Sequence, residues 1–370
     1  MAFSLEAVSA KQGDCLLLHW GDAKAPRHAL IDGGPSGVYE QWLKPRLGVL
    51  AHPDRPAELE LVLVSHIDDD HIHGVLDLFG ESIEAEQDEL TAPCIIKRLW
   101  HNAFRELTGS ALTDASAELD AGASVREGVP ASAIVASVGQ GGRLQADAGG
   151  LGVPINDGQG GLIVGGAVSQ LPGGLKLSVI SPSTAQLDAL RARWQAEASK
   201  HGNAAALAAA YLDTSVYNRS SIVVLAQVGE RRMLLTGDAR GDEVIAGLQA
   251  TGLLDDRDVL ELDLLKVPHH GSSRNVAQCF FDRIHAHHYV ISADGKYGNP
   301  ENETLQMILD SRSDDCFTIH LTNHEGEDGL GARLDAFFAQ ARDRGRRFDL
   351  VYRDPQKASL SVDLGDAGAP

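Results

Sequence analysis

A dense group of histidine and aspartate residues lies between residues 66 and 73 of the 370-residue chain. The group comprises His66, Asp68, Asp69, Asp70, His71 and His73. Imidazole and carboxylate groups at this spacing suit zinc, and also manganese or iron. We therefore expect His66 and Asp68 to serve one metal ion, and Asp70 and His71 to serve a second. The alternative is a solvated acidic loop whose aspartates only cap a helix.

The residues around this group predict a buried strand, a ligand-rich turn and a helix. Leu61–Val64 form the apolar run of the strand, and Val75 and Leu76 begin the apolar face of the helix. A strand that ends in metal-capable residues recurs at three other places: Asp32, Asp238 and the pair His269–His270. Because strand ends can meet along one edge of a sheet, we expect these side chains to form one metal or catalytic centre.

Two further residues at strand ends are candidate parts of the same centre. Asp32 closes the third predicted strand, where it would orient a ligand histidine or make an Asx turn before the glycines that follow it. His101 ends a predicted strand at 95–100, as a metal ligand, a substrate contact or a hydrogen-bonded core residue.

Apolar periodicity predicts an alternation of strands and helices along the whole chain. The expected strands are 3–8, 15–20, 28–31, 59–64, 95–100, 175–180, 222–228, 232–236, 261–267, 289–292, 317–322, 348–353 and 359–364. The expected helices are 37–50, 74–79, 184–199, 241–251, 274–283, 303–311 and 331–342. Residues from about 103 to 175 are rich in alanine and glycine, and we expect an insertion over one end of the core, conceivably a lid. The glycines at 139–142, 148–152 and 157–161 are expected to form turns.

Composition limits the classes of protein that fit this sequence. A hydrophobic fraction of 43% supports a sizeable core, and we expect a single domain over 1–370. The formal net charge of −20 excludes a generally basic nucleic-acid binder but not a nuclease with bound divalent cations. The four cysteines show no C-x-x-C spacing, and no signal peptide or membrane span is present, so we expect a soluble cytoplasmic protein. The sequence does not indicate an oligomeric state.

Several motifs together resemble the metallo-β-lactamase superfamily, specifically the metallo-hydrolase domain of the DNA-uptake competence protein ComEC. The principal matches are H-x-D-x-D-H at His66–His71, T-G-D at Thr236–Asp238 and K-V-P-H-H-G-S at Lys266–Ser272. Supporting matches are Q-G-D at Gln12–Asp14, I-D-G-G at Ile31–Gly34, N-x-x-S at Asn218–Ser221 and K-Y-G-N-P at Lys296–Pro300. They occur in the family's order from residue 12 to residue 300.

The resemblance implies an α/β fold, the αβ/βα four-layer sandwich, with two zinc ions at one edge of the sheets. It places His66 and Asp68 on the first ion, Asp70 and His71 on the second, and Asp238 between them. One residue of the pair His269/His270 completes the second site. We favour His269, which follows its strand more directly, and expect His270 to face substrate or to support a ligand.

The sequence also departs from the family. Asp68 stands in place of the superfamily's second histidine, as in the competence branch, and Asn218 stands where most members have a further histidine. The first metal site is therefore expected to be weak, to take manganese or magnesium, or to borrow His101. Asn299 replaces a histidine that is usual in the competence branch, so a different substrate is an open alternative.

The expected activity is metal-assisted hydrolysis, in which a cation lowers the pKa of a bound water. The residues expected to take part in catalysis are Asp70, Asp238, His270 and Asn218. A phosphodiester, in nucleic acid or a smaller molecule, is the first choice of substrate. Basic residues near the motifs are candidate phosphate contacts: Arg98, Arg219, Lys266, Arg274 and Lys296. The alternatives are hydrolysis of esters, lactones or thioesters, and a non-catalytic metal-binding module in a bacterial defence or signalling system.

Overall fold

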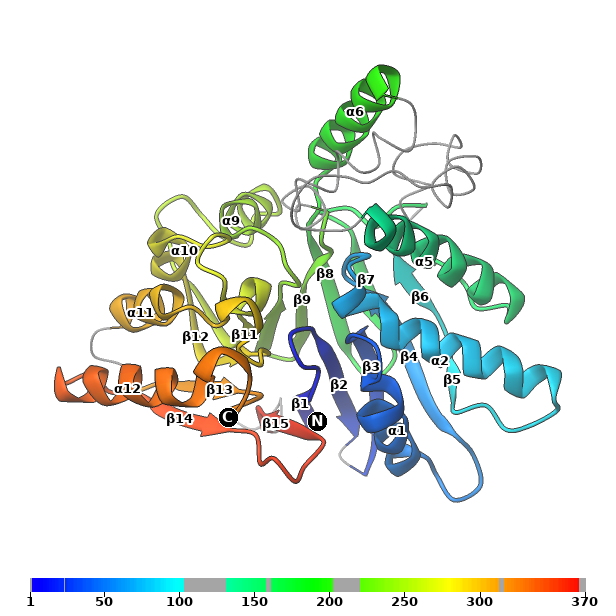
Figure 1. Ribbon diagram of the computed structural model, residues 1–370, viewed down its shortest axis with the longest axis horizontal. Helices are drawn as coiled ribbons and strands as arrows, with labels where there is room; N and C mark the ends of the chain where they lie inside the picture. The colour runs from blue at the N-terminus through cyan, green and yellow to red at the C-terminus, as the bar shows by residue number, and fades with distance from the viewer. Residues whose placement is uncertain are drawn as a thin grey trace.

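A computed structural model describes residues 2–22, 24–102, 131–157, 161–201, 220–312 and 316–365. Residues 131–139 and 193–201 are described by their backbone only. Two mixed β-sheets face each other in the middle of the molecule, and helices cover their outer faces (Figure 1). The first and last described strands of the chain are neighbours in one of these sheets.

The first sheet has the strand order β15-β1-β2-β3-β4-β5, with β6 also paired to β4. Its strands are β15 (Ser359–Asp363), β1 (Ala2–Val8), β2 (Cys15–Asp22), β3 (Ala25–Gly33), β4 (Ala57–Val64), β5 (Cys94–Ile96) and β6 (Leu99–His101). Strands β15 to β3 pair in antiparallel fashion, whereas β3, β4, β5 and β6 are parallel.

The second sheet has the order β14-β13-β12-β11-β10-β9-β8-β7. Its strands are β14 (Asp349–Tyr352), β13 (Thr318–Leu321), β12 (Ile284–Ile291), β11 (Leu260–Lys266), β10 (Arg231–Leu235), β9 (Val223–Val228), β8 (Leu175–Ser181) and β7 (Val168–Leu171). Strands β10 to β14 are parallel to one another, and β7 to β10 are antiparallel.

The helices form the two outer layers (Figure 1). The layer over the first sheet contains α1 (Lys44–Leu50), α2 (Asp69–Gln87) and α5 (Ala131–Gly150). The layer over the second sheet contains α9 (Gly241–Ala250), α10 (Gln278–Arg283), α11 (Asn302–Ser311) and α12 (Leu330–Asp343), and α6 (Thr184–His201) projects beyond the upper edge. Among these described helices, none is both long and apolar enough to cross a membrane.

Strand β4 shows why the sequence produces this layered arrangement. Val62 and Val64 pack into the cluster beneath α1 and α2, whereas Leu61 and Leu63 pack into the cluster between the two sheets. A strand buried on both faces needs an almost continuous apolar run, and β4 has one. A third cluster lies between the second sheet and α9 to α12. The expected αβ/βα sandwich of four layers is therefore confirmed for the described residues.

The region expected to be a turn-rich insertion contains regular structure. Gly139–Gly142 lie within helix α5, and β7 belongs to the second sheet, so the expectation of turns at 139–142 is wrong. A Cβ atom at Gly141 would lie 3.3 Å from Ile67 and 3.4 Å from Nε2 of His101. Glycine at this position lets α5 lie close to the ligand-bearing turn, although glycine has a low helix propensity. Residues 103–130 lie outside the described part of the chain.

Three other expected elements have different boundaries. Helix α2 begins at Asp69 rather than at residue 74, so two of the candidate ligands lie in its first turn. The strand expected at 95–100 is two short strands, β5 and β6, and the helix expected at 274–283 begins only at Gln278.

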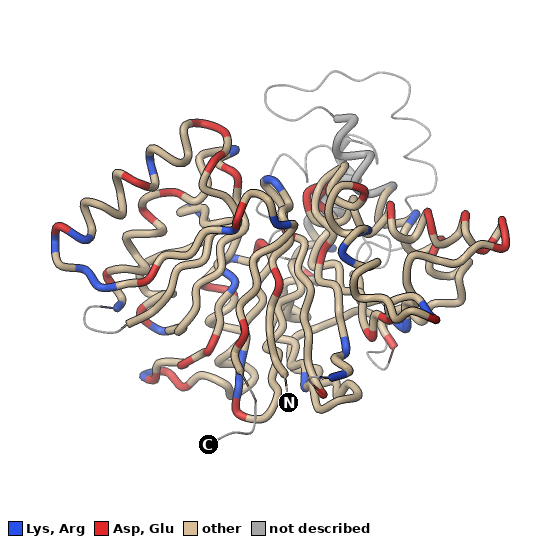
Figure 2. The backbone as a smooth tube through the Cα atoms, turned by 90° about the horizontal axis from the view of Figure 1, so that it is seen from below, with Lys and Arg blue, Asp and Glu red and all other residues tan. Residues whose placement is uncertain are grey.

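Most charged residues lie on helices and loops around the largely uncharged strands (Figure 2).

Candidate metal centre

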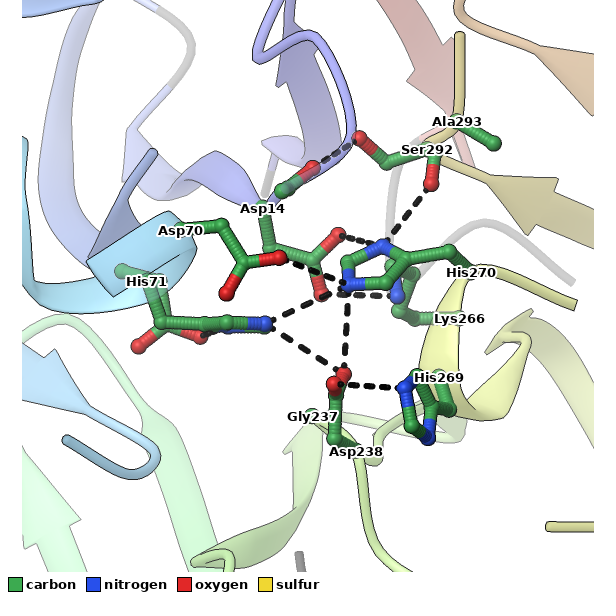
Figure 3. A network of polar contacts seen from close by, with 12 residues as sticks. Asp14, Asp70, His71, Gly237, Asp238, Lys266, His269, His270, Ser292 and Ala293 are labelled. Carbon is green, nitrogen blue, oxygen red and sulfur yellow. Dashed lines mark hydrogen bonds and ion pairs between the residues drawn. The ribbon is translucent and has the colours of Figure 1, made fainter. Parts of the chain in front are cut away.

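The candidate ligands lie where parallel strands of both sheets end at the same edge. Asp32 ends β3, and His66 follows β4 in the first sheet. Asp238 follows β10 and the pair His269–His270 follows β11 in the second sheet. Because the two sheets face each other, these four turns converge between them. Figure 3 shows Asp70, His71, Asp238 and the histidine pair at this place.

Four side chains form a compact group that we call the tight cluster: Asp70, His71, Asp238 and His270. Nε2 of His71 lies 3.3 Å from Oδ1 of Asp238, and Nε2 of His270 lies 3.4 Å from the same oxygen. The two Nε2 atoms are 3.3 Å apart, and Oδ2 of Asp70 is 3.9 Å from Nε2 of His270 (Figure 3). Ligands about 2.0–2.1 Å from a tetrahedral zinc ion are about 3.3–3.4 Å from one another, so the tight cluster has the dimensions of a zinc site.

The other carboxylate oxygen of Asp238 faces a second, wider group, the open cluster: His66, Asp68, Asp238 and His269. Oδ2 of Asp238 lies 3.5 Å from Nε2 of His269 and 3.8 Å from Nε2 of His66. Oδ2 of Asp68 is 3.6 Å from Nε2 of His66. The side chains of Asp68 and His269 are 28% and 27% exposed, whereas His66 and His71 are fully buried, so this cluster opens to solvent.

Hydrogen bonds orient the buried histidine rings toward Asp238. The Nδ1 atom of His71 donates to Oδ2 of Asp32 at 2.9 Å, and that of His270 donates to the carbonyl oxygen of Ser292 at 2.9 Å. Ser65 donates to Asp32 through its backbone nitrogen and its hydroxyl, leaving the hydroxyl oxygen to accept from Nδ1 of His66 at 3.0 Å. These partners occupy the Nδ1 atoms, so each Nε2 atom faces the centre, the arrangement that supports metal-ligating histidines.

The buried polar atoms of the centre fit a bound cation. Nε2 of His66 has no hydrogen-bond partner, and Oδ1 of Asp238 makes no hydrogen bond of regular geometry, although it lies 3.3–3.4 Å from Nε2 of His71 and His270. A buried polar atom without a hydrogen bond costs about 1–3 kcal/mol, so these atoms need a compensating interaction. A divalent cation would supply it, and the set of imidazole nitrogens and carboxylate oxygens suits zinc or manganese.

The charges of the centre shift the pKa values of its histidines in the metal-free protein. Burial by itself lowers the pKa of His270, but the carboxylates of Asp238 and Asp14 outweigh it and raise the pKa to about 10. The pKa of His71 is likewise raised well above its ordinary value, because Asp238 and Asp32 outweigh the effect of burial. Burial opposes ionisation of Asp238, yet His269, His270 and His71 hold its pKa well below the usual range.

These shifts predict that metal binding becomes tighter as the pH rises. At neutral pH His71 and His270 hold protons that a cation must displace, so binding releases protons. For each proton displaced, the apparent Kd for Zn²⁺ is expected to fall about tenfold for every unit by which the pH rises, as long as the pH stays below the pKa of the histidine. Calorimetric titration in buffers of different ionisation enthalpy would count the protons, and a Kd independent of pH would contradict the prediction.

The raised pKa of His270 affects the folding stability of the metal-free protein in the opposite direction: this stability falls as the pH rises. The folded-state pKa of His270 lies above its ordinary value of 6.5, so its favourable contribution is complete below that value. That contribution is lost as the pH rises toward about 10. Metal loading and metal-free stability therefore respond to pH in opposite directions.

Comparisons with known proteins find distant similarity only. No protein-family model matches the sequence, and no curated protein is significantly similar to it. The diiron β-hydroxylase CmlA from Streptomyces venezuelae aligns with a TM-score of 0.39 and 10% identity, over 98% of this chain and 54% of CmlA. The chain thus spans about half the length of CmlA.

A second solved structure aligns with this chain over almost the whole length of both proteins. It is a protein from Parabacteroides distasonis whose name assigns it to the metal-dependent hydrolases, with a TM-score of 0.31 and 9% identity. The alignment covers 94% of this chain and 97% of that protein. At these values neither protein assigns a family or an activity to this chain, and the centre is interpreted from its own geometry.

The structure reverses the expected order of the two adjacent histidines. We expected His269 beside Asp70 and His71, yet His270 occupies that position and His269 lies on the Oδ2 side of Asp238. Both residues have left-handed backbone conformations, with φ of 46° and 55°. Such a conformation costs about 1–2 kcal/mol in a residue other than glycine. The turn therefore points neighbouring rings at different oxygens of one carboxylate, which the strand pattern could not predict.

One member of the centre was not expected from the sequence. Asp14, in the turn between β1 and β2, is 1% exposed and lies within ligand range of Asp238 and His270. The sequence signal for Asp14 was the Q-G-D motif, which was one of the supporting matches to the metallo-β-lactamase superfamily but was given no role in the centre. Gly13 lies so close to Asp70 that a Cβ atom would be 1.9 Å from the carbonyl oxygen of Asp70. A glycine is thus required before Asp14.

The remaining candidates lie outside the two clusters. His101 is fully buried, faces α5 and has no hydrogen-bond partner for its ring, and burial lowers its pKa to about 4. Lys266 is fully buried and pairs with Asp14, so it is not available to a substrate. Lys296 lies on the loop after β12 with its ammonium 5.2 Å from the ring of Tyr297. Asn218 lies outside the described residues, and so does Arg219.

Proposed function

We propose that this protein is a metal-dependent hydrolase that uses two divalent cations to cleave phosphodiester bonds. The observation that carries the proposal is the position of Asp238 between two groups of potential ligands. Its Oδ1 atom faces the tight cluster and its Oδ2 atom faces the open cluster. A carboxylate that presents one oxygen to each of two groups is suited to bridge a pair of cations.

In this proposal the two clusters divide the ligands evenly. The tight cluster supplies Asp70, His71, His270 and one oxygen of Asp238, and the open cluster supplies His66, Asp68, His269 and the other oxygen. His269 would thus take the place of the histidine that Asn218 replaces in the family pattern. The distances from Asp238 to the imidazole nitrogens are 3.5 and 3.8 Å in the open cluster, against 3.3 and 3.4 Å in the tight cluster, which favours a weaker or more adaptable open site. We propose zinc in the tight cluster, with manganese or magnesium as alternatives in the open one.

Charge balance supports the presence of two cations. Five carboxylates surround the centre, those of Asp14, Asp32, Asp68, Asp70 and Asp238, and the ammonium of Lys266 lies among them. So many negative charges in a buried place are unfavourable unless cations compensate them. Two divalent cations together with Lys266 would balance the five carboxylates.

When bound, a pair of such cations lowers the pKa of water and stabilises the charge that develops on a phosphodiester and its leaving oxygen. The chain itself determines the side from which substrate approaches. His71 is enclosed, whereas Asp68, Asp70 and His269 are partly exposed, so substrate would approach the centre past these three side chains. Arg274, exposed on the loop after the histidine pair, could contact phosphate there.

The first experiment is metal analysis of the purified protein combined with a substrate panel. The panel contains bis-p-nitrophenyl phosphate, single-stranded DNA, RNA and simple carboxylic esters, each with Zn²⁺ or Mn²⁺. We expect about two ions per chain and turnover of phosphodiesters. Turnover of esters alone would reject the phosphodiester assignment. Metal binding without any turnover would favour the non-catalytic interaction module.

A further inference from the structure

We infer that the buried ion pair of Asp14 and Lys266 positions His270 as a metal ligand. The inference depends on the proposed metal centre, because it concerns the affinity of the tight cluster for its cation. Asp14 comes from the first sheet and Lys266 from the second, so the pair also connects the two halves that supply ligands.

The contacts of the pair direct it at His270. Nζ of Lys266 lies 2.7 Å from Oδ2 of Asp14, and both side chains are almost completely buried, with exposures of 0% and 1%. The other oxygen of Asp14 lies 3.5 Å from Nδ1 of His270, on the side of the ring opposite to the ligand atom (Figure 3). Because the Nδ1 proton of His270 goes to the carbonyl oxygen of Ser292, Asp14 acts on the ring through its charge, and a carboxylate behind a ligand histidine raises the basicity of that ligand.

Backbone contacts hold the pair at a fixed place in the centre. The amide of Asp14 donates to the carbonyl oxygen of Asp70 at 3.2 Å, and the hydroxyl of Ser292 donates to the carbonyl oxygen of Gly13 at 2.6 Å. The carbonyl oxygen of Lys266 accepts from the hydroxyl of Thr236 at 2.7 Å. The pair is therefore tied to the turns that carry Asp70, Asp238 and His270. A shift of either member would be transmitted to the ligands.

Lys266 also explains why Asp14 supports the ligands rather than joining them. Asp14 lies within 4.8 Å of Asp238 and His270, close enough to compete for a cation. The ammonium of Lys266 occupies one of its oxygens, which leaves the other to face His270. A buried ion pair is weak evidence for stability, because apolar residues of similar volume often serve as well. Its place behind a ligand instead indicates a role in metal affinity.

The test removes both charges together, because either residue alone would leave its partner buried without a counter-charge. In the full-length Asp14→Asn, Lys266→Met double variant, we expect the Kd for Zn²⁺ at the tight cluster to rise about 10–100-fold. The absorption spectrum of the Co²⁺-loaded protein should also change, since it reports ligand geometry directly. Circular dichroism would establish that the variant is folded.

A matched control is the pair Glu6–Arg46, which joins β1 to α1, where Glu6 is 2% exposed and the two side chains are 2.7 Å apart. The Glu6→Gln, Arg46→Met variant should lower the melting temperature without changing Zn²⁺ affinity or the Co²⁺ spectrum. A wild-type Kd and spectrum in the Asp14/Lys266 variant would overturn the inference while leaving the metal centre intact. Absence of Zn²⁺ binding by the wild-type protein would overturn both the inference and the proposed function.

Discussion

An Asp70→Ala, His71→Ala double variant is expected to lose hydrolytic activity by at least about 1,000-fold, to the level of the uncatalysed reaction. Both residues belong to the tight cluster, and His71 contacts Asp238 and His270 through one nitrogen atom. Their removal leaves only one histidine and one carboxylate to hold the cation. Hydrolysis of bis-p-nitrophenyl phosphate with saturating Zn²⁺ or Mn²⁺ measures the effect.

The same helix provides a matched control for this loss. Asp69 and His73 lie one residue before and two residues after the pair, and contact each other on the partly exposed side of α2 at 2.8 Å. Neither belongs to the tight or the open cluster. An Asp69→Ala, His73→Ala variant should therefore retain most of its activity. Equal activity of the two double variants would show that the tight cluster does not carry out the reaction.

The second large effect concerns the two adjacent histidines, whose single replacements are expected to differ. His269→Ala should retain one tightly bound ion per chain and lose the second, because Nε2 of His269 faces Oδ2 of Asp238, on the side of the open cluster. His270→Ala should weaken the tight site by more than about 100-fold, because it removes a direct ligand and its oriented ring.

Metal content after dialysis, measured by mass spectrometry, separates these outcomes. Titration with Co²⁺ gives an independent count, since the two clusters would show different spectra. Two retained ions in His269→Ala would mean that the open cluster does not use this residue. Identical losses in both variants would contradict the division of the pair between two cations.

The sequence predicted the layers and most strands because their signals are local. The apolar run of β4 and the helical period after Gly74 can be seen in a short window of residues, although α2 begins five residues earlier, at Asp69. The recurrence of metal-capable residues at Asp32, Asp238 and the histidine pair indicated that these side chains meet at one edge of the sheets. It did not indicate the distances between them. The types of ligand could therefore be predicted, and their partners in part.

What the sequence did not reveal depends on backbone conformation and on contacts between distant segments. The order of His269 and His270 follows from two consecutive left-handed residues, which no periodicity reports. Asp14 and Lys266 are 252 positions apart and meet only when the sheets pack together. Gly141 of α5 resembles a turn residue in the sequence, and its close approach to Ile67 becomes visible only in the folded protein.

Each cluster combines ligands from the two ends of a long stretch of chain. His71 and His270 are separated by 199 positions, and the segments of the first sheet supply only Asp70 and His71 to the tight cluster. A nascent chain that has not yet reached residue 270 would therefore have no complete coordination sphere. Cation capture would have to follow synthesis of β11 and the histidine pair after it, so that loading with metal would report that ligands from both sheets have come together.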